Sequence, residues 1–115
     1  MEVTIYHNPR CSKSRATLAL LEKRGIEPRV ILYLETPPSA QQIRELLGLL
    51  GMTPRELIRS GEKEYRELRL SDPATTDEDL ISAMHNCPRL LQRPIVVVNG
   101  AARIGRPPES VLDIL

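Results

Sequence analysis

The N-terminal part of the sequence predicts a strand, a tight turn and a helix, with a cysteine at the turn. Val3–Tyr6 alternates in the manner of a half-buried strand. Apolar residues at helical spacing begin shortly after Cys11 and continue to about Arg24. Gly25 is suited to end this helix, because glycine readily adopts the left-handed conformation. We therefore expect the thiol of Cys11 at a helix N-terminus.

The residues around Cys11 favour its ionised form. A helix N-terminus attracts an anion, because its backbone N–H groups have no partners within the helix and the helix dipole is positive there. Arg10, Lys13 and Arg15 add positive charge nearby, and a protonated His7 would add more. These surroundings favour the thiolate, which is the nucleophilic form of cysteine. The alternative, a small residue that only fills a turn, agrees less well with these neighbours.

Strand patterns at both ends of the chain predict a mixed sheet. Val30–Leu34 is a nearly continuous apolar run, which is typical of a strand in the buried interior of a sheet. Ile95–Val98 is a second such run, and Asn99–Gly100 is a strong hairpin signal before Ala101–Ile104. A last short helix is expected to pack on the sheet. The fold class is therefore α/β, with a mixed four-stranded sheet, flanking helices and a helical insert.

The predicted insert contains three helices. The first and the third begin with capping boxes, Ser39 with Gln42 and Thr75 with Glu78, and the second opens at Thr53–Glu56. The second helix is expected to carry Arg59. The third is expected to stop at Pro88 and places Cys87 on an apolar stripe. Cys87 is therefore predicted to be a small buried core residue, although a resolving thiol is the alternative.

Composition restricts the classes of function. The 115 residues fit a single domain over 1–115, and the net charge of +1 comes from acidic and basic residues mixed along the chain. That mixture predicts no nucleic-acid partner and no membrane surface. The sequence shows no membrane span or signal segment, and its two cysteines lack the spacing of a zinc site or a disulfide framework. A cytoplasmic protein without a metal or a bound cofactor is expected.

Four short motifs closely resemble the ArsC family of glutaredoxin-coupled arsenate reductases. They are His7–Arg15, Leu57–Arg59, Gln92–Val97 and Arg103–Pro107. The resemblance extends over nearly the entire chain, with the motifs in the family's order. It implies a thioredoxin-like fold with a helical insert, which agrees with the predicted order of elements. It also implies a cis peptide bond between Arg93 and Pro94, beside the thiol.

The same resemblance implies the roles of the site residues. Cys11 is the catalytic nucleophile, and three arginines, Arg59, Arg93 and Arg106, are both catalytic and substrate-binding. Guanidinium groups bind tetrahedral oxyanions such as arsenate bidentately and neutralise the charge that a thiolate must approach. A solvated surface arginine is the alternative for each, and Arg59 has the further alternative of stabilising the C-terminal end of its helix.

Supporting roles are expected for His7, Ser14, Arg15 and Pro94. His7 has two interpretations, a cation that stabilises the thiolate and a structural residue at the end of a strand. Ser14 also has two, a hydrogen-bond donor to the sulfur and a residue of the first helical turn.

The resemblance implies arsenate, glutathione and glutaredoxin as partners. Glutathione would serve as a co-substrate, because Ser14 occupies the position at which a Cys-x-x-Cys enzyme has its second thiol. Two alternatives remain open. One is another glutathione-linked thiol oxidoreductase, which needs Cys11 but not three arginines. The other is a regulator of the Spx type, which binds RNA polymerase and uses a Cys-x-x-Cys switch that Ser14 removes.

Overall fold

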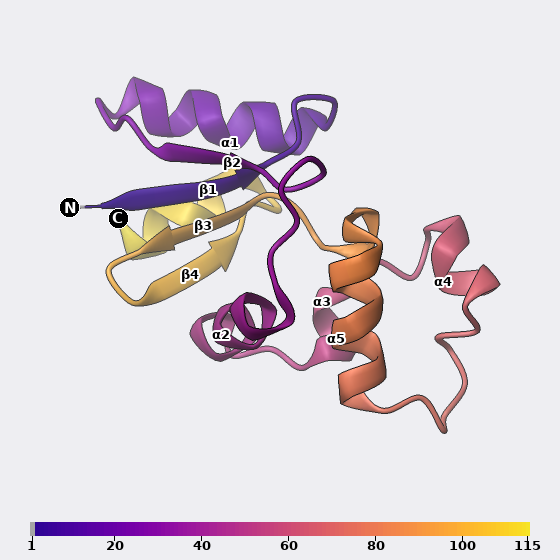
Figure 1. The fold of residues 1–115 in the computed structure, drawn as a ribbon. Helices are drawn as coiled ribbons and strands as arrows, with labels where there is room; N and C mark the ends of the chain where they lie inside the picture. The colour runs from indigo at the N-terminus through magenta and orange to yellow at the C-terminus, as the bar shows by residue number, and fades with distance from the viewer. Residues whose placement is uncertain (1) are drawn as a thin grey trace. The chain divides into compact units, whose positions relative to one another are not determined.

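The computed structural model describes residues 2–115, which divide into two compact units (Figure 1). The first contains residues 2–36 and 93–115, and the second contains 37–92. A single domain over residues 1–115 stays a prediction. None of the helices in the described part of the chain is long and apolar enough to cross a membrane.

The first unit is a four-stranded sheet with helical segments packed on it. Its elements are β1 (Val3–His7), α1 (Ser12–Lys23), β2 (Arg29–Leu32), β3 (Ile95–Val98), β4 (Ala101–Ile104) and the 3₁₀ helix η2 (Pro108–Ile114). The strand order is β2-β1-β3-β4, with β1 parallel to β2 and antiparallel to β3. Strands β3 and β4 form the predicted hairpin, and Asn99 and Gly100 between them have positive φ values of 46° and 80°. The predicted mixed sheet is confirmed.

One prediction about this sheet is wrong. The apolar run that begins at Val30 was expected inside the sheet, whereas β2 is an edge strand and the Val30 side chain is 44% exposed. The strand ends at Leu32, and Tyr33 and Leu34 lie in the turn that follows. An apolar run without alternation does not distinguish a central strand from an edge strand, because that depends on which strands pair with it.

The core of this unit lies between the central strands and the helical segments. Ile5 of β1, Val96 of β3, Leu21 of α1 and Val111 of η2 are completely buried and belong to one cluster. Gly25, with φ of 75°, ends α1: the N–H of Ile26 donates to Leu21 O and that of Gly25 to Glu22 O. This ending turns Ile26 back against the core. Leu21 and Ile26 thus hold α1, at whose N-terminus Cys11 lies, against the core.

The second unit is helical. Its elements are α2 (Ala40–Leu50), α3 (Pro54–Leu57), α4 (Lys63–Glu67), α5 (Asp77–Asn86) and the 3₁₀ helix η1 (Pro88–Leu90). The capping box predicted at the start of α2 is confirmed, and the helix predicted to open at Thr53 is present as α3, where Thr53 and Glu56 also form a capping box. The one predicted at Thr75 with Glu78 is wrong by one residue, because Thr76 and Asp79 form the box of α5. Glu78 instead pairs with Arg44, at 2.7 Å.

Two further predictions about this unit need correction. Helix α3 ends at Leu57, and Ile58 pairs with Leu91 in an isolated β-bridge, so Arg59 is not helical. Its N–H donates to Leu90 O at 2.7 Å. Cys87 follows the last residue of α5 and is only half-buried, whereas a fully buried position was expected. The sequence pattern continued the helical spacing through Cys87, but the backbone leaves the helix one residue earlier.

Candidate active site

Cys11 lies on the turn between β1 and α1, at the N-cap position of the helix. Its N–H donates to Asn8 O at 3.0 Å, and the N–H of Arg10 donates to Asn8 Oδ1 at 3.0 Å. Asn8 is buried and therefore organises the turn from inside. The thiol of Cys11 is half-buried. This is the strand-turn-helix position that the sequence predicts for the nucleophile.

Two of the three predicted arginines lie beside the Cys11 thiol. Arg106 Nη2 is 3.6 Å from Cys11 Sγ, although 95 positions separate the two residues in the sequence. Arg106 Nε donates to Arg93 O at 2.8 Å, and the Arg93 side chain is hydrogen-bonded to the sulfur. The predicted cis peptide bond between Arg93 and Pro94 is present, and a second one joins Arg106 to Pro107. The structure thus brings two guanidinium groups to one thiol.

These contacts lower the pKa of Cys11. Partial burial is the largest influence and acts in the opposite direction, because it disfavours a charge. The hydrogen bonds outweigh it: the backbone N–H of Ser14, the side chain of Arg93 and the backbone N–H of Lys13 all favour the thiolate. The positive charge of Arg106 acts in the same direction. Cys11 is therefore prepared to act as a nucleophile.

We predict that Cys11 titrates below the value of about 8.5 that is usual for a free cysteine. Its reaction with iodoacetamide should then be close to its maximal rate at weakly alkaline pH and should slow as the pH falls through the lowered pKa. Thiolate absorbance measured against pH, with Cys11→Ser as the blank, checks this. Arg106→Ala should raise the pKa, and Arg103→Ala, at an exposed position on β4, should not. A wild-type pKa at the ordinary value would contradict the assignment.

The residues expected to support Cys11 act mainly on the turn. Ser14 Oγ is completely buried, accepts the N–H of Asn8 at 3.0 Å and lies 2.6 Å from His7 Nδ1. Burial, and after it the charge of Arg15, lowers the pKa of His7 and favours a neutral imidazole. This geometry agrees with the structural interpretation of His7. Arg15 donates from Nη1 to Pro9 O at 2.9 Å and so holds the turn from its other side.

Arg106 is positioned by a close contact that the sequence did not predict. Gly105 donates from its N–H to Pro94 O at 3.0 Å, and a Cβ at Gly105 would collide with the side chains of Thr17 and Pro94. Thr17 is completely buried on α1, where its Oγ1 donates to Lys13 O at 2.8 Å. Only glycine fits between these groups. The signal in the sequence was a glycine that directly follows a strand and precedes Arg106.

We predict that Gly105→Ala destabilises the protein by about 1 to 3 kcal/mol, which is the usual cost of overpacking a filled site. The displaced backbone should also move Arg106 and reduce turnover. Gly48→Ala is the matched control, because that glycine lies in α2 with nothing within 4 Å of an added Cβ. This control should be stabilised by about 0.5 to 1 kcal/mol. Urea unfolding of both variants gives the comparison, and equal stability of Gly105→Ala and wild type would show that the site is not tightly packed.

Arg59 belongs to the second unit. Its Nε lies 3.4 Å from Glu62 Oε1, and Glu62 also pairs with Arg89, at 3.5 Å. The carboxylate of Glu62 therefore lies between two guanidinium groups and orients the side chain of Arg59. The role of Arg59 in oxyanion binding stays a prediction from the resemblance.

Comparison with known proteins identifies the family. The ArsC family matches residues 6–114. Uncharacterized protein YfgD of Escherichia coli (strain K12) is 59% identical, and the match covers 99% of this chain and 97% of the relative. An arsenate reductase of Rhizobium meliloti (strain 1021) is 47% identical, with 100% of this chain and 82% of the relative covered.

The solved structures agree with this assignment. The structure of an arsenate reductase from Vibrio cholerae is 55% identical and has a TM-score of 0.98, over 100% of this chain and 98% of that chain. This match, together with the mixed sheet and its flanking helices, confirms the predicted thioredoxin-like fold. The motifs around Cys11 and the whole-length similarity lead to one conclusion: the chain is a member of the ArsC family.

Proposed function

We propose that this protein reduces arsenate to arsenite, with Cys11 as the nucleophile and with glutathione and glutaredoxin as the electron donors. The main support is the geometry of one thiol, which has a lowered pKa and an arginine nitrogen at 3.6 Å. The names of the Rhizobium meliloti and Vibrio cholerae relatives support the choice of arsenate. The reducing cytoplasm is the compartment that this chemistry needs.

The first step in the proposed reaction forms a covalent arsenic–sulfur bond. Arg93 and Arg106 bind oxygen atoms of arsenate and neutralise its charge, which otherwise repels the thiolate. The sulfur of Cys11 attacks arsenic, and one arsenate oxygen leaves as water after it is protonated. The product is a Cys11 thioarsenate in which arsenic is still pentavalent.

The electrons come from external thiols in the steps that follow. The thiol of glutathione replaces a second arsenate oxygen, which also leaves as water, so that arsenic carries both sulfurs. A glutaredoxin thiolate then attacks the glutathione sulfur, and the electron pair of the arsenic–sulfur bond remains on arsenic, which becomes trivalent. The products are a glutaredoxin–glutathione disulfide and a Cys11 thioarsenite. Water hydrolyses the latter to arsenite and regenerates the Cys11 thiol.

A coupled assay tests this proposal. Arsenate-dependent oxidation of NADPH is measured with glutathione, glutathione reductase and glutaredoxin, and each component is omitted in turn. We expect activity only when all of them are present. Absence of arsenate activity, together with reduction of glutathionylated substrates, would replace this proposal with a general glutathione-linked thiol oxidoreductase.

A further inference from the structure

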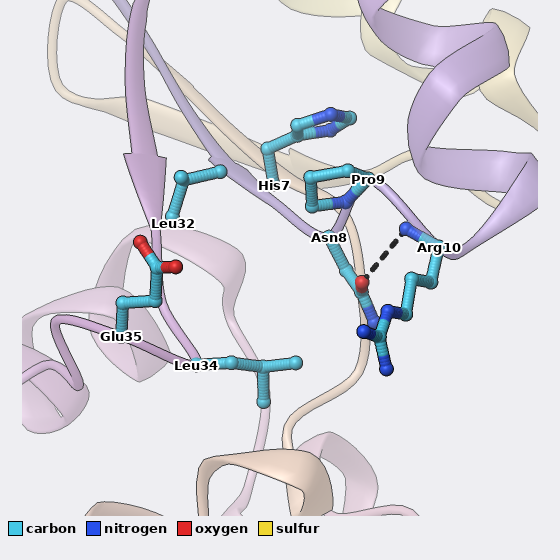
Figure 2. Close-up of a pocket in the computed structure, with 7 residues that line it drawn as sticks. All are labelled: His7, Asn8, Pro9, Arg10, Leu32, Leu34 and Glu35. Carbon is cyan, nitrogen blue, oxygen red and sulfur yellow. Dashed lines mark hydrogen bonds between the residues drawn. The ribbon is translucent and has the colours of Figure 1, made fainter.

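A cavity beside the nucleophile's turn has no role in the proposed binding of arsenate. Its volume is about 280 Å³, and it lies in the first unit at the carboxyl ends of the parallel strands β1 and β2 (Figure 2). Open α/β sheets commonly bind ligands at the carboxyl ends of their parallel strands. Pro9, Leu32 and Leu34 give the cavity an apolar wall, and the Leu34 side chain is 39% exposed.

Two opposite charges lie on different sides of this cavity. Figure 2 shows the guanidinium group of Arg10 on one side and the carboxylate of Glu35 on the other, with the apolar side chain of Leu34 below and between them. Within residues 2–115, neither charged group forms an ion pair. A ligand that fits this arrangement has a carboxylate at one end, an ammonium group at the other and CH₂ groups between them that can contact the apolar wall.

Hydrogen bonds form this cavity before any ligand arrives. The Asn8 side chain accepts the N–H of Arg10, and the Asn8 backbone oxygen accepts the N–H of Cys11, so one buried residue organises both the cavity wall and the nucleophile. On the other wall, the N–H groups of Glu35 and Thr36 both donate to Leu32 O at 2.9 Å. A ligand held at Arg10 is therefore held beside the turn that carries the thiol.

We propose that this cavity binds glutathione, the thiol co-substrate, with its glycine carboxylate at Arg10 and its γ-glutamyl ammonium group at Glu35. This inference rests on the proposed function, in which glutathione is the thiol that reacts with the arsenic bound to Cys11. The glycine carboxylate and the γ-glutamyl ammonium group match the two charges, and the cysteine between them presents its sulfur from the middle of the ligand. The second carboxylate of glutathione, beside the ammonium group, has no further lysine or arginine partner among the lining residues and is left in solvent. The cavity thus selects a charged peptide thiol over a small neutral thiol.

Binding of S-methylglutathione to the full chain tests this proposal without turnover. Isothermal titration calorimetry should show saturable binding to the wild type. Glu35→Gln and Arg10→Gln should each weaken it by about fivefold, because solvent-facing charge pairs contribute up to about 1 kcal/mol. Arg24→Gln and Glu27→Gln are the matched controls, since both positions are exposed and outside the cavity, and they should bind like the wild type.

Changing the ligand assigns each charge to its partner. Esterifying the glycine carboxylate should weaken binding to the wild type by about fivefold but should leave binding to Arg10→Gln unchanged. The comparison of the two ligands on the wild-type protein does not depend on whether any variant folds. In the coupled assay, the KM for glutathione should rise in both cavity variants while the KM for arsenate stays constant.

The outcomes separate this proposal from the proposed function. If the protein binds S-methylglutathione in a charge-dependent manner but does not reduce arsenate, the cavity assignment is supported and arsenate is rejected as the substrate. Glutathione-dependent arsenate reduction with wild-type binding in Arg10→Gln and Glu35→Gln overturns the cavity assignment and leaves the reaction intact. Absence of saturable binding to the wild type also overturns the cavity assignment.

Discussion

Replacing Cys11 with serine is expected to abolish arsenate reduction. A serine hydroxyl is scarcely ionised at neutral pH, so it supplies no nucleophile at the N-terminus of α1. The coupled assay measures the loss, and arsenite formation measured directly excludes an effect on the coupling enzymes. Because the side chains are similar in size, we expect the variant to fold as the wild type does.

Cys87→Ser is the control for this variant and should keep most of the activity. Cys87 lies after α5 and is half-buried, and its thiol is free. The cost of placing a hydroxyl there should be a loss of stability of at most about 1 to 3 kcal/mol. Equal loss of activity in the two serine variants would mean that both thiols react and would contradict the single-cysteine mechanism.

Arg106→Lys should reduce arsenate turnover by about a hundredfold or more, although it keeps the positive charge. The guanidinium group of Arg106 makes two contacts at once, from Nε to Arg93 O at 2.8 Å and from Nη2 towards Cys11 Sγ at 3.6 Å. Lysine has a single nitrogen and cannot make both contacts while it also binds an oxyanion bidentately. Steady-state kinetics with arsenate, at saturating glutathione and glutaredoxin, measure the effect.

Two comparisons isolate the cause of that loss. Arg103→Lys, three positions earlier and exposed on β4, should behave like the wild type. Alkylation of Cys11 by iodoacetamide, which carries no charge, should change much less than turnover in Arg106→Lys, because no oxyanion has to be bound. Wild-type arsenate turnover in Arg106→Lys would exclude bidentate binding by this residue. The same kinetics on Arg59→Ala test the role that the resemblance implies for Arg59.

Local sequence predicted those parts of the structure that depend on neighbouring residues. The turn at Cys11, the glycine ending of α1 and the hairpin at Asn99–Gly100 each depend on a few consecutive residues, and all three are confirmed. Errors arose where local patterns allowed two answers. Thr75 and Thr76 are both suitable capping residues with an acidic residue three positions later. In the structure Thr76 and Asp79 form the box, and Glu78 pairs with Arg44.

For the candidate site, too, the sequence predicted the local features and the tertiary structure decided the others. The chain's membership in the ArsC family and the helix N-terminus at which Cys11 lies were apparent from the sequence, because motifs and helix ends are local. Tertiary structure decided that Arg106 reaches the thiol and that β2 lies at an edge. It also decided that burial favours a neutral His7. Each of these depends on strand pairing or desolvation by residues far away in the chain, which no local pattern records.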